Sequence, residues 1–445
     1  MCSELLRIPL SYNGVPIFGY GVLLVAWLAF GAWGVATTAK ATDWSTALRA
    51  HLPTILIVAA AIALFIPRYF PDGVPIRGYG VMVLAGSVAG IALALYRAQQ
   101  ARIPAEEIMG LAVAMFIGGV VGARLFYVIE YWNERIRQDD WLSTLKAAVS
   151  FTEGGLVVYG AFMGAMLAFA VYVRRRKLPA LAIADMIAAS MVVGLALGRI
   201  GCLLNGCCYG GESTAPWALT FPRESGPSTV SPPYADQYYA QAVSGKHYGF
   251  RIANSTDVKL ALVITGVDDG SAADRAGLQI GDVIVRIRVL PLELGEPPSE
   301  LKNFPMKNAE WQIWNAFING GRLELLSSSG QLIEIPSNPS PPRSRPVHPT
   351  QIYSSITAAL LAWVLWSYYP FRRREGEVTA LMITLYPIAR YLEEIIRVDE
   401  PSVFGTGLSI SQNVSLLLLA GAVGMWLWLR KQPPGHQIFS TAAPS

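Results

Sequence analysis

Charged residues are scarce in this chain. Only 15% of its 445 residues are Asp, Glu, Lys or Arg, whereas 53% are hydrophobic and twelve are tryptophans. Because a typical soluble domain carries about 25% charged residues, this composition excludes an ordinary soluble protein and predicts an integral membrane protein. The net charge of +4 is small, and we interpret it as a signal of membrane topology rather than of nucleic-acid binding.

Cysteine and histidine are also rare, with four residues each. Four cysteines in a chain of this length provide no disulfide framework, and the cluster of Cys202, Cys207 and Cys208 lacks the Cys/His spacing of a recognised metal site. We therefore expect packing cysteines, no metal and no other cofactor. The scattered histidines exclude the His-Glu-x-x-His helix of an intramembrane metalloprotease. A clear signal-peptide cleavage site is lacking too, so the first apolar run is expected to be retained as a span.

Long apolar runs predict an all-α polytopic membrane protein. With roughly 20 residues needed per spanning helix, we expect about nine spans, near residues 17–36, 52–67, 78–96, 107–129, 156–173, 182–204, 351–370, 378–395 and 408–429. If these spans alternate, the basic clusters near residues 97–102, 174–177, 372–374 and 430–431 all lie on one side. By the positive-inside rule that side is cytoplasmic, as is the C-terminus.

The segment of residues 225–345 interrupts the apolar pattern, because it is polar and rich in Pro, Ser and Gly. It predicts a small β-rich domain inserted outside the cytoplasm. The stretch from Val267 to Ile284 resembles the centre of a PDZ domain, with a strand, a short helix ending at Gly277 and a turn at Gly281 into another strand. PDZ domains bind extended peptides at a sheet edge. A peptide-binding role and a spacer role both remain open for this insertion.

Arginines inside the apolar runs are the main chemical signal. An arginine at the centre of a lipid-embedded helix costs about 2.5–3.5 kcal/mol on insertion scales, so it faces a protein interior and has a partner there. Arg199 and Arg390 lie on different expected helices, and together they suit a phosphate, which accepts charge-assisted bidentate bonds. Arg390, Glu394 and Arg397 recur at helical spacing, so a salt-bridge ladder that locks helices together is the alternative role for the last two.

Six ordered motifs carry a resemblance to the prolipoprotein diacylglyceryl transferase family. They are a Tyr79-Gly80 helix entry, a Gly-Gly-x-x-Gly-x-Arg segment ending at Arg124, a Gly154-Gly155 loop, a Gly198-Arg199-x-Gly201 to Asn205-Gly206 signature, a His348-Pro349-Thr350-Gln351 helix entry and the Arg390 to Arg397 block. The resemblance implies two extra N-terminal helices in residues 1–73, a seven-helix transferase core in residues 74–224 and 346–432, a PDZ-like insertion in 225–345 and a cytoplasmic tail in 433–445. It places the protein in the bacterial inner membrane, with the insertion in the periplasm.

The resemblance also implies a reaction. A diacylglyceryl group would move from phosphatidylglycerol to the lipobox cysteine of a preprolipoprotein, which forms a thioether and releases glycerol phosphate. The residues matching the family's catalytic positions are Arg199, Arg390 and Tyr159. Those matching its substrate-binding positions are Tyr79, Arg124, Gly154, Gly155, Asn205, His348, Glu394 and Arg397.

One departure from the family concerns the proton acceptor. The family often has His-Gly-Gly where this chain has Tyr159-Gly160-Ala161. Tyrosine, with an ordinary pKa near 10, is a poor base at neutral pH, so the group that takes the thiol proton is left open. The alternative function is an inactive membrane-tethered PDZ scaffold, although it would leave the buried charges unexplained.

Overall fold

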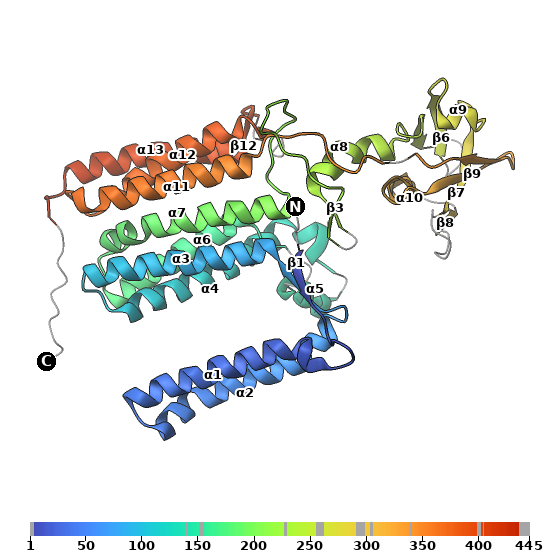
Figure 1. Cartoon of the computed structure of the whole chain (residues 1–445). Coiled ribbons are helices and arrows are strands. Elements are labelled where there is room, and N and C mark those ends of the chain that lie inside the picture. Colours follow the sequence, from blue (N-terminus) through green and yellow to red (C-terminus); the bar gives the residue numbers. More distant parts are fainter. Residues whose placement is uncertain are drawn as a thin grey trace. The chain divides into compact units, whose positions relative to one another are not determined.

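The computed structural model describes residues 4–138, 140–150, 155–226, 229–254, 262–290, 299–302, 306–338, 340–397, 402–403 and 405–435 (Figure 1). The chain forms two compact units, each built from two separated segments. The helical unit comprises Gly78–Cys202 and Thr350–Ser445, and the mixed unit comprises Met1–Arg77 and Leu203–Pro349. The boundaries at 202/203 and 349/350 lie outside the expected insertion of residues 225–345 on both sides.

The helical unit consists of long helices that run roughly side by side (Figure 1). In chain order its elements are α3 (Gly78–Gln100), α4 (Ala105–Glu130), η2 (Trp132–Ile136), α5 (Trp141–Val149), α6 (Val158–Arg176), α7 (Ala180–Asn205, of which the last three residues belong to the mixed unit), α11 (Thr350–Tyr368), η3 (Tyr369–Phe371), α12 (Glu377–Glu394), β11 (Ser402–Val403), β12 (Leu408–Ser409) and α13 (Ile410–Arg430).

Glycines allow α4 and α6 to approach closely. A methyl group built on Gly164 would lie 2.1 Å from the carbonyl oxygen of Gly118, and one built on Gly122 would lie 2.3 Å from that of Gly160. No side chain fits at these positions, so the two backbones pack directly against each other. Such contacts are typical of helices packed within a membrane, where close van der Waals packing replaces the hydrophobic effect.

Two of the expected basic clusters meet at one end of the helical unit, because the guanidinium groups of Arg97 and Arg372 both lie over the Tyr369 ring. The Arg97 guanidinium lies 3.7 Å from the centre of the Trp366 ring and donates to the Trp366 carbonyl at 2.8 Å. Asp185, fully buried near the start of α7, accepts from the backbone N–H of Gly376 at 2.7 Å and of Thr379 at 2.8 Å. Since a carboxylate stabilises the positive end of a helix, Asp185 holds the start of α12 against α7.

Each of the nine expected spans coincides with a described helix. Six of the described helices, α1, α2, α3, α4, α7 and α13, are long and apolar enough to cross a membrane. The helices α6, α11 and α12 have 19, 19 and 18 residues. The chain is therefore a polytopic membrane protein.

The N-terminal part of the mixed unit is a helical hairpin with a strand at each end. These elements are β1 (Glu4–Ile8), η1 (Pro16–Phe18), α1 (Gly21–Ala41), α2 (Trp44–Tyr69) and β2 (Val74–Arg77), and β1 pairs antiparallel with β2. The Asp43 carboxylate caps α2 by accepting from the N–H groups of Ser45 at 2.8 Å and Thr46 at 2.9 Å. These bonds, together with those from the two hydroxyl groups, hold the pKa of Asp43 well below its usual range.

The rest of the mixed unit contains the β-rich domain. Its elements are β3 (Glu224–Gly226), β4 (Thr229–Val230), α8 (Pro232–Val243), β5 (Phe250–Asn254), β6 (Leu262–Val267), α9 (Ala272–Arg275), β7 (Val283–Leu290), β8 (Ser299–Lys302), α10 (Met306–Asn319), β9 (Arg322–Ser327) and β10 (Leu332–Ile335). The main sheet has the order β10-β9-β7-β6-β5, with β8 also paired to β7.

The expected local order around Gly277 and Gly281 is confirmed. Strand β6 is followed by the short helix α9, by Gly277 and Gly281 with φ angles of +85° and +94°, and by β7. Next to this motif, His247 packs edge-on against Phe317 with ring centres 4.4 Å apart. Burial lowers the pKa of His247 and raises that of the neighbouring Tyr248.

Candidate functional site

Arg199 and Arg390 line one small cavity in the helical unit. Arg199 comes from the last turns of α7 and Arg390 from the last turns of α12, and Ser354 of α11 also lines the cavity. The cavity has a volume of about 20 Å³, which is room for one water-sized group. Two cationic residues far apart in sequence therefore line the same cavity, as the hypothesis of a shared phosphate requires.

A buried carboxylate fixes Arg390. One terminal nitrogen of its guanidinium donates to Glu394, one helical turn further along α12, and another donates to the Ser411 hydroxyl at 2.8 Å. Glu394 is only 5% exposed, and the Nε of Arg397 lies 3.6 Å from one of its oxygens. The expected charge row thus exists as an Arg390–Glu394–Arg397 network, in which two arginines share one carboxylate.

The start of α13 completes this network. The hydroxyl of its N-cap residue Ser409 donates to Glu394 at 3.0 Å and accepts from the Gln412 N–H at 3.2 Å, while the Gln412 side chain accepts from the Ser409 N–H at 3.1 Å. This capping box fixes the beginning of α13. Because the N-terminal end of a helix carries a partial positive charge, it further stabilises the buried carboxylate.

Arg199 differs from Arg390 in its partners. Among the residues that the structure describes, the Arg199 side chain makes no hydrogen bond or ion pair, although it is half-buried. A partly buried cation without an internal partner is suited to binding an external anion. Arg390 is oriented by the protein, whereas Arg199 is available to a ligand.

Sequence patterns assigned no role to Glu393 and Ser354, which both line this cavity. Glu393 lines the cavity, and its carboxylate accepts a hydrogen bond from the Ser354 hydroxyl at 2.5 Å. The sequence signal was the pair Glu393-Glu394, which places a carboxylate on each of two neighbouring faces of α12. Spacing alone could not show that Glu394 binds the arginines while Glu393 faces the cavity.

Tyr79 packs close to the Arg199 segment. A methyl group built on Gly201 would lie 3.2 Å from the ring carbon Cδ2 of Tyr79 and 3.3 Å from its carbonyl oxygen. Gly201 therefore lets the first turn of α3 approach α7 two residues beyond Arg199. A side chain at position 201 would therefore crowd the Tyr79 ring.

Arg124 and Gly155 meet at a different place in the helical unit. The three guanidinium nitrogens of Arg124 donate to the carbonyl groups of Ala147, Ala148 and Gly155 at 2.6, 2.8 and 3.0 Å. Arg124 is 7% exposed, so it joins α4 to the end of α5 and to the segment before α6. Arg124 therefore fixes the positions of these three segments relative to one another. The neighbouring Gly154 lies outside the described residues.

The remaining candidates are not brought to this cavity. Tyr159, in the first turn of α6, is 37% exposed and is not among the residues that line the cavity. Asn205 ends α7 and His348 lies half-buried in the mixed unit, where its backbone N–H donates to the Gly211 carbonyl at 3.0 Å. Cys202, Cys207 and Cys208 are each half-buried.

This arrangement favours anion chemistry. The cavity with the two arginines contains cationic groups, hydroxyls and one carboxylate, which can bind a phosphate and accept a proton, and its lining includes no cysteine or histidine. Positioned cations of this kind stabilise charge that develops on a leaving group.

Comparisons with known proteins agree with this chemistry. The family described as prolipoprotein diacylglyceryl transferase matches residues 67–428. A protein of Rhodopirellula baltica named phosphatidylglycerol–prolipoprotein diacylglyceryl transferase is 32% identical over 95% of this chain and 88% of its own length. A protein of the same name from Corynebacterium glutamicum is 24% identical over 80% of each chain. One from Acaryochloris marina is 34% identical over 35% of this chain and 55% of its own length. The chain belongs to the prolipoprotein diacylglyceryl transferase family.

Proposed function

We propose that this protein transfers the diacylglyceryl group of phosphatidylglycerol to the lipobox cysteine of a preprolipoprotein. The observation that carries the proposal is the convergence of Arg199 and Arg390 on one cavity between α7, α11 and α12. The names of the relatives supply the substrates, and the two arginines supply the charge that the phosphate of such a lipid needs.

In the proposed reaction the thiolate sulfur attacks the carbon of the diacylglycerol half of the lipid that is bonded to the phosphate through oxygen. The carbon–oxygen bond breaks, its electron pair passes to the phosphate oxygen, and glycerol phosphate leaves while a thioether forms. Arg199 and Arg390 stabilise the negative charge that builds up on this leaving group. Because the cavity of about 20 Å³ holds only one water-sized group, it must widen to admit a phosphate. The Arg199 side chain shifts to do so and stays in contact with the phosphate, whereas Arg390 is held in place by Glu394 and Ser411.

The thiol proton needs an acceptor, since a free cysteine has a pKa of about 8.5. Glu393 lines the cavity and its carboxylate is oriented by Ser354, so we assign it this role. The hydroxyl of Tyr159 makes no hydrogen bond to any residue in the described part of the chain. Its proposed role is to contact the substrate where it enters.

The remaining family-matched residues support this site. Glu394 and Arg397 orient Arg390, and Arg124 with Gly155 shapes the entry to α6. Tyr79, at the start of α3, is proposed to contact substrate, and Asn205 and His348 stay predicted substrate contacts within the mixed unit. We further propose nine spans in the bacterial inner membrane. The meeting of Arg97, Asp185 and the Arg372 region at one end of the helical unit supports a cytoplasmic location for that end.

The β-rich domain is proposed to be a periplasmic peptide-binding module. Strand β5 ends the main sheet, with β6 as its neighbour within the described residues. An edge strand offers unpaired backbone groups to which an extended peptide can add. Deletion of residues 225–345 should weaken the transfer to the native lipoprotein more than the transfer to a short lipobox peptide.

The test uses the purified full-length protein in vesicles of phosphatidylglycerol with a synthetic lipobox peptide. Mass spectrometry should show a diacylglyceryl thioether on the cysteine, and Arg199→Ala should abolish it. Arg175→Ala, which removes an exposed arginine on α6, should retain the activity. If the wild-type protein modifies neither this peptide nor a native lipoprotein, the result favours the scaffold alternative.

A further inference from the structure

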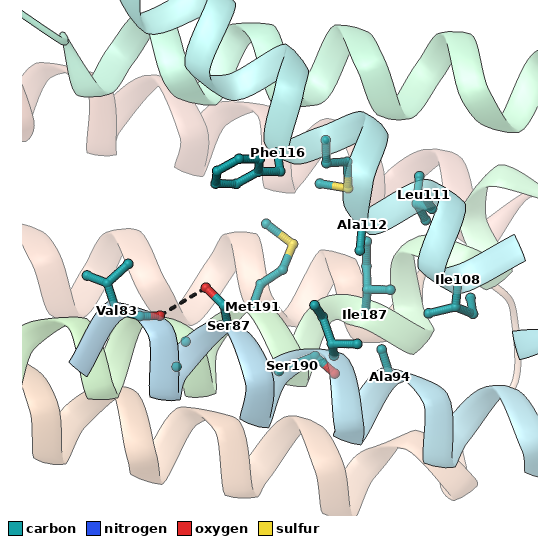
Figure 2. A pocket seen from close by; sticks show the side chains of 15 residues that line it. Val83, Ser87, Ala94, Ile108, Leu111, Ala112, Phe116, Ile187, Ser190 and Met191 are labelled. Carbon is teal, nitrogen blue, oxygen red and sulfur yellow. Dashed lines mark hydrogen bonds between the residues drawn. The ribbon is translucent and has the colours of Figure 1, made fainter. Parts of the chain in front are cut away.

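A second, larger pocket lies between α3, α4 and α7 (Figure 2). Its volume is about 340 Å³, which is within the range of small-molecule sites. Its lining is apolar apart from two serines, and the Ser87 hydroxyl donates to the Val83 carbonyl of its own helix at 2.9 Å. No charged residue lines it. The pocket therefore suits a hydrocarbon group.

Close contacts at glycines set the register of α3 against α7 beside this pocket. A methyl group on Gly86 would lie 3.0 Å from the Gly194 carbonyl oxygen, and one on Gly90 would lie 3.0 Å from that of Ser190. Together with the Tyr79–Gly201 contact, these pairs show that α3 and α7 run antiparallel in constant register. The pocket thus extends along α7 away from Arg199.

The pocket has an open side and a closed end. Its open side includes Val83, Phe116 and Met191, which are 40%, 73% and 41% exposed. Its closed end includes Leu111 and Ile187, which are 2% and 8% exposed and belong to one apolar cluster. Because the exposed residues lie on spanning helices, they face lipid. A hydrocarbon chain can enter sideways from the bilayer and end against this closed wall.

The distance to Arg199 matches the reach of one lipid chain. Ile187 lies twelve positions before Arg199 on α7, which corresponds to about 18 Å along the helix. One leaflet of the hydrocarbon core is about 15 Å deep. Measured along the helix axis, a lipid with its phosphate at Arg199 therefore has its chain ends level with Ile187. The chain must pass around α7 to reach the pocket, because the pocket lies on the side of α7 that faces α3 and α4, whereas the Arg199 cavity lies on the side that faces α11 and α12.

We propose that this pocket binds one acyl chain of the phospholipid substrate and selects its length. The inference rests on the proposed transferase function and adds a specificity determinant to it. Lipid tails are already in an apolar medium, so entering the pocket gains packing contacts rather than hydrophobic transfer. The pocket accordingly discriminates by shape: a chain that is too long meets the closed end formed by Leu111 and Ile187.

The first test narrows the pocket. Ala112 lines it (Figure 2), whereas its neighbour Val113 is 54% exposed and does not. Wild type, Ala112→Phe and the matched control Val113→Phe are supplied with equal amounts of dimyristoyl- and distearoylphosphatidylglycerol and a lipobox peptide. Ala112→Phe should shift the product ratio about tenfold towards the shorter chains, and Val113→Phe should leave it unchanged. An unchanged ratio in active Ala112→Phe would overturn the proposal.

A second measurement does not depend on catalysis. Phosphatidylglycerol with a diazirine at the end of one acyl chain is photolysed with the protein, and labelled peptides are mapped. Labelling at residues 108–116 that excess phosphatidylglycerol competes away, and that Ala112→Phe reduces, supports the pocket even if no transfer occurs. Equal labelling by a phosphatidylethanolamine probe, competition only by the lipobox peptide, or no labelling there would overturn it.

Discussion

Removal of Arg199 and removal of Arg390 should have different consequences, although both are expected to bind the phosphate. Arg390 is held by Glu394 and by Ser411 at 2.8 Å. Arg199 has no hydrogen-bonding or ionic partner in the described ranges of the chain. We therefore expect Arg199→Ala to reduce activity alone, and Arg390→Ala to reduce both activity and stability.

The magnitudes follow from these partners. In Arg390→Ala the 5% exposed Glu394 keeps Ser409 and the more distant Arg397, and loss of one member of a buried ion pair costs about 3–5 kcal/mol of unfolding free energy. Arg199→Ala should cost less than about 1 kcal/mol. Each charge-assisted bond to phosphate contributes about 1.5–3 kcal/mol, so loss of a bidentate contact slows transfer roughly 10²- to 10⁴-fold.

The assay pairs thermal unfolding of the full-length protein in detergent with initial transfer rates in phosphatidylglycerol vesicles. Arg175→Ala is the control for loss of a positive charge, because this arginine lies exposed in the last turn of α6. The double variant Arg390→Ala/Glu394→Gln should be more stable than Arg390→Ala, since it no longer carries the poorly paired buried carboxylate.

Two results would refute this reasoning. Equal destabilisation by Arg199→Ala and Arg390→Ala would mean that Arg199 has a structural role comparable to that of Arg390. A near-normal transfer rate in Arg199→Ala would show that this arginine does not bind the leaving group.

Further predictions concern four other positions. Glu393→Gln should lower the rate constant for transfer while leaving the KM for the lipobox peptide and the thermal stability unchanged, whereas a purely structural role for Glu393 would lower the stability. Tyr159→Phe should raise the KM for the lipobox peptide without changing stability, and an unchanged KM would argue against substrate contact. Gly155→Ala should cost about 1–3 kcal/mol, because φ is +82° and the new methyl group would lie 2.6 Å from the Tyr127 ring; thermal unfolding measures this loss, and an unchanged unfolding temperature would contradict it. The lowered pKa of His247 means that the unfolded chain binds the proton more readily, so stability of the β-rich domain should be full above about pH 6.5 and fall as the pH drops. Hydrogen exchange of β6 should show this fall, and His247→Phe should abolish it.

The membrane class and the helices were predictable from local sequence. Apolar runs of about 20 residues leave few alternatives to helices, because the backbone must satisfy its own hydrogen bonds in lipid. The pattern Gly277 to Gly281 likewise predicted the turn between β6 and β7, since glycine readily adopts positive φ angles. The prediction that Arg199 and Arg390 bind one anion also came from sequence, because a buried arginine needs an anionic partner.

The roles of individual charges depended on tertiary contacts. Arg124 and Arg199 look alike as arginines among small apolar residues, yet Arg124 donates to three backbone carbonyls and Arg199 lines a cavity. Glu393 and Glu394 are adjacent in sequence, yet Glu393 accepts a hydrogen bond from Ser354 and Glu394 accepts one from Arg390. The sequence by itself determined that these charges lie within the apolar helices. Only the packing of α7, α11, α12 and α13 decided which of them are neutralised internally, because partners distant in sequence meet through helix contacts that local patterns do not encode.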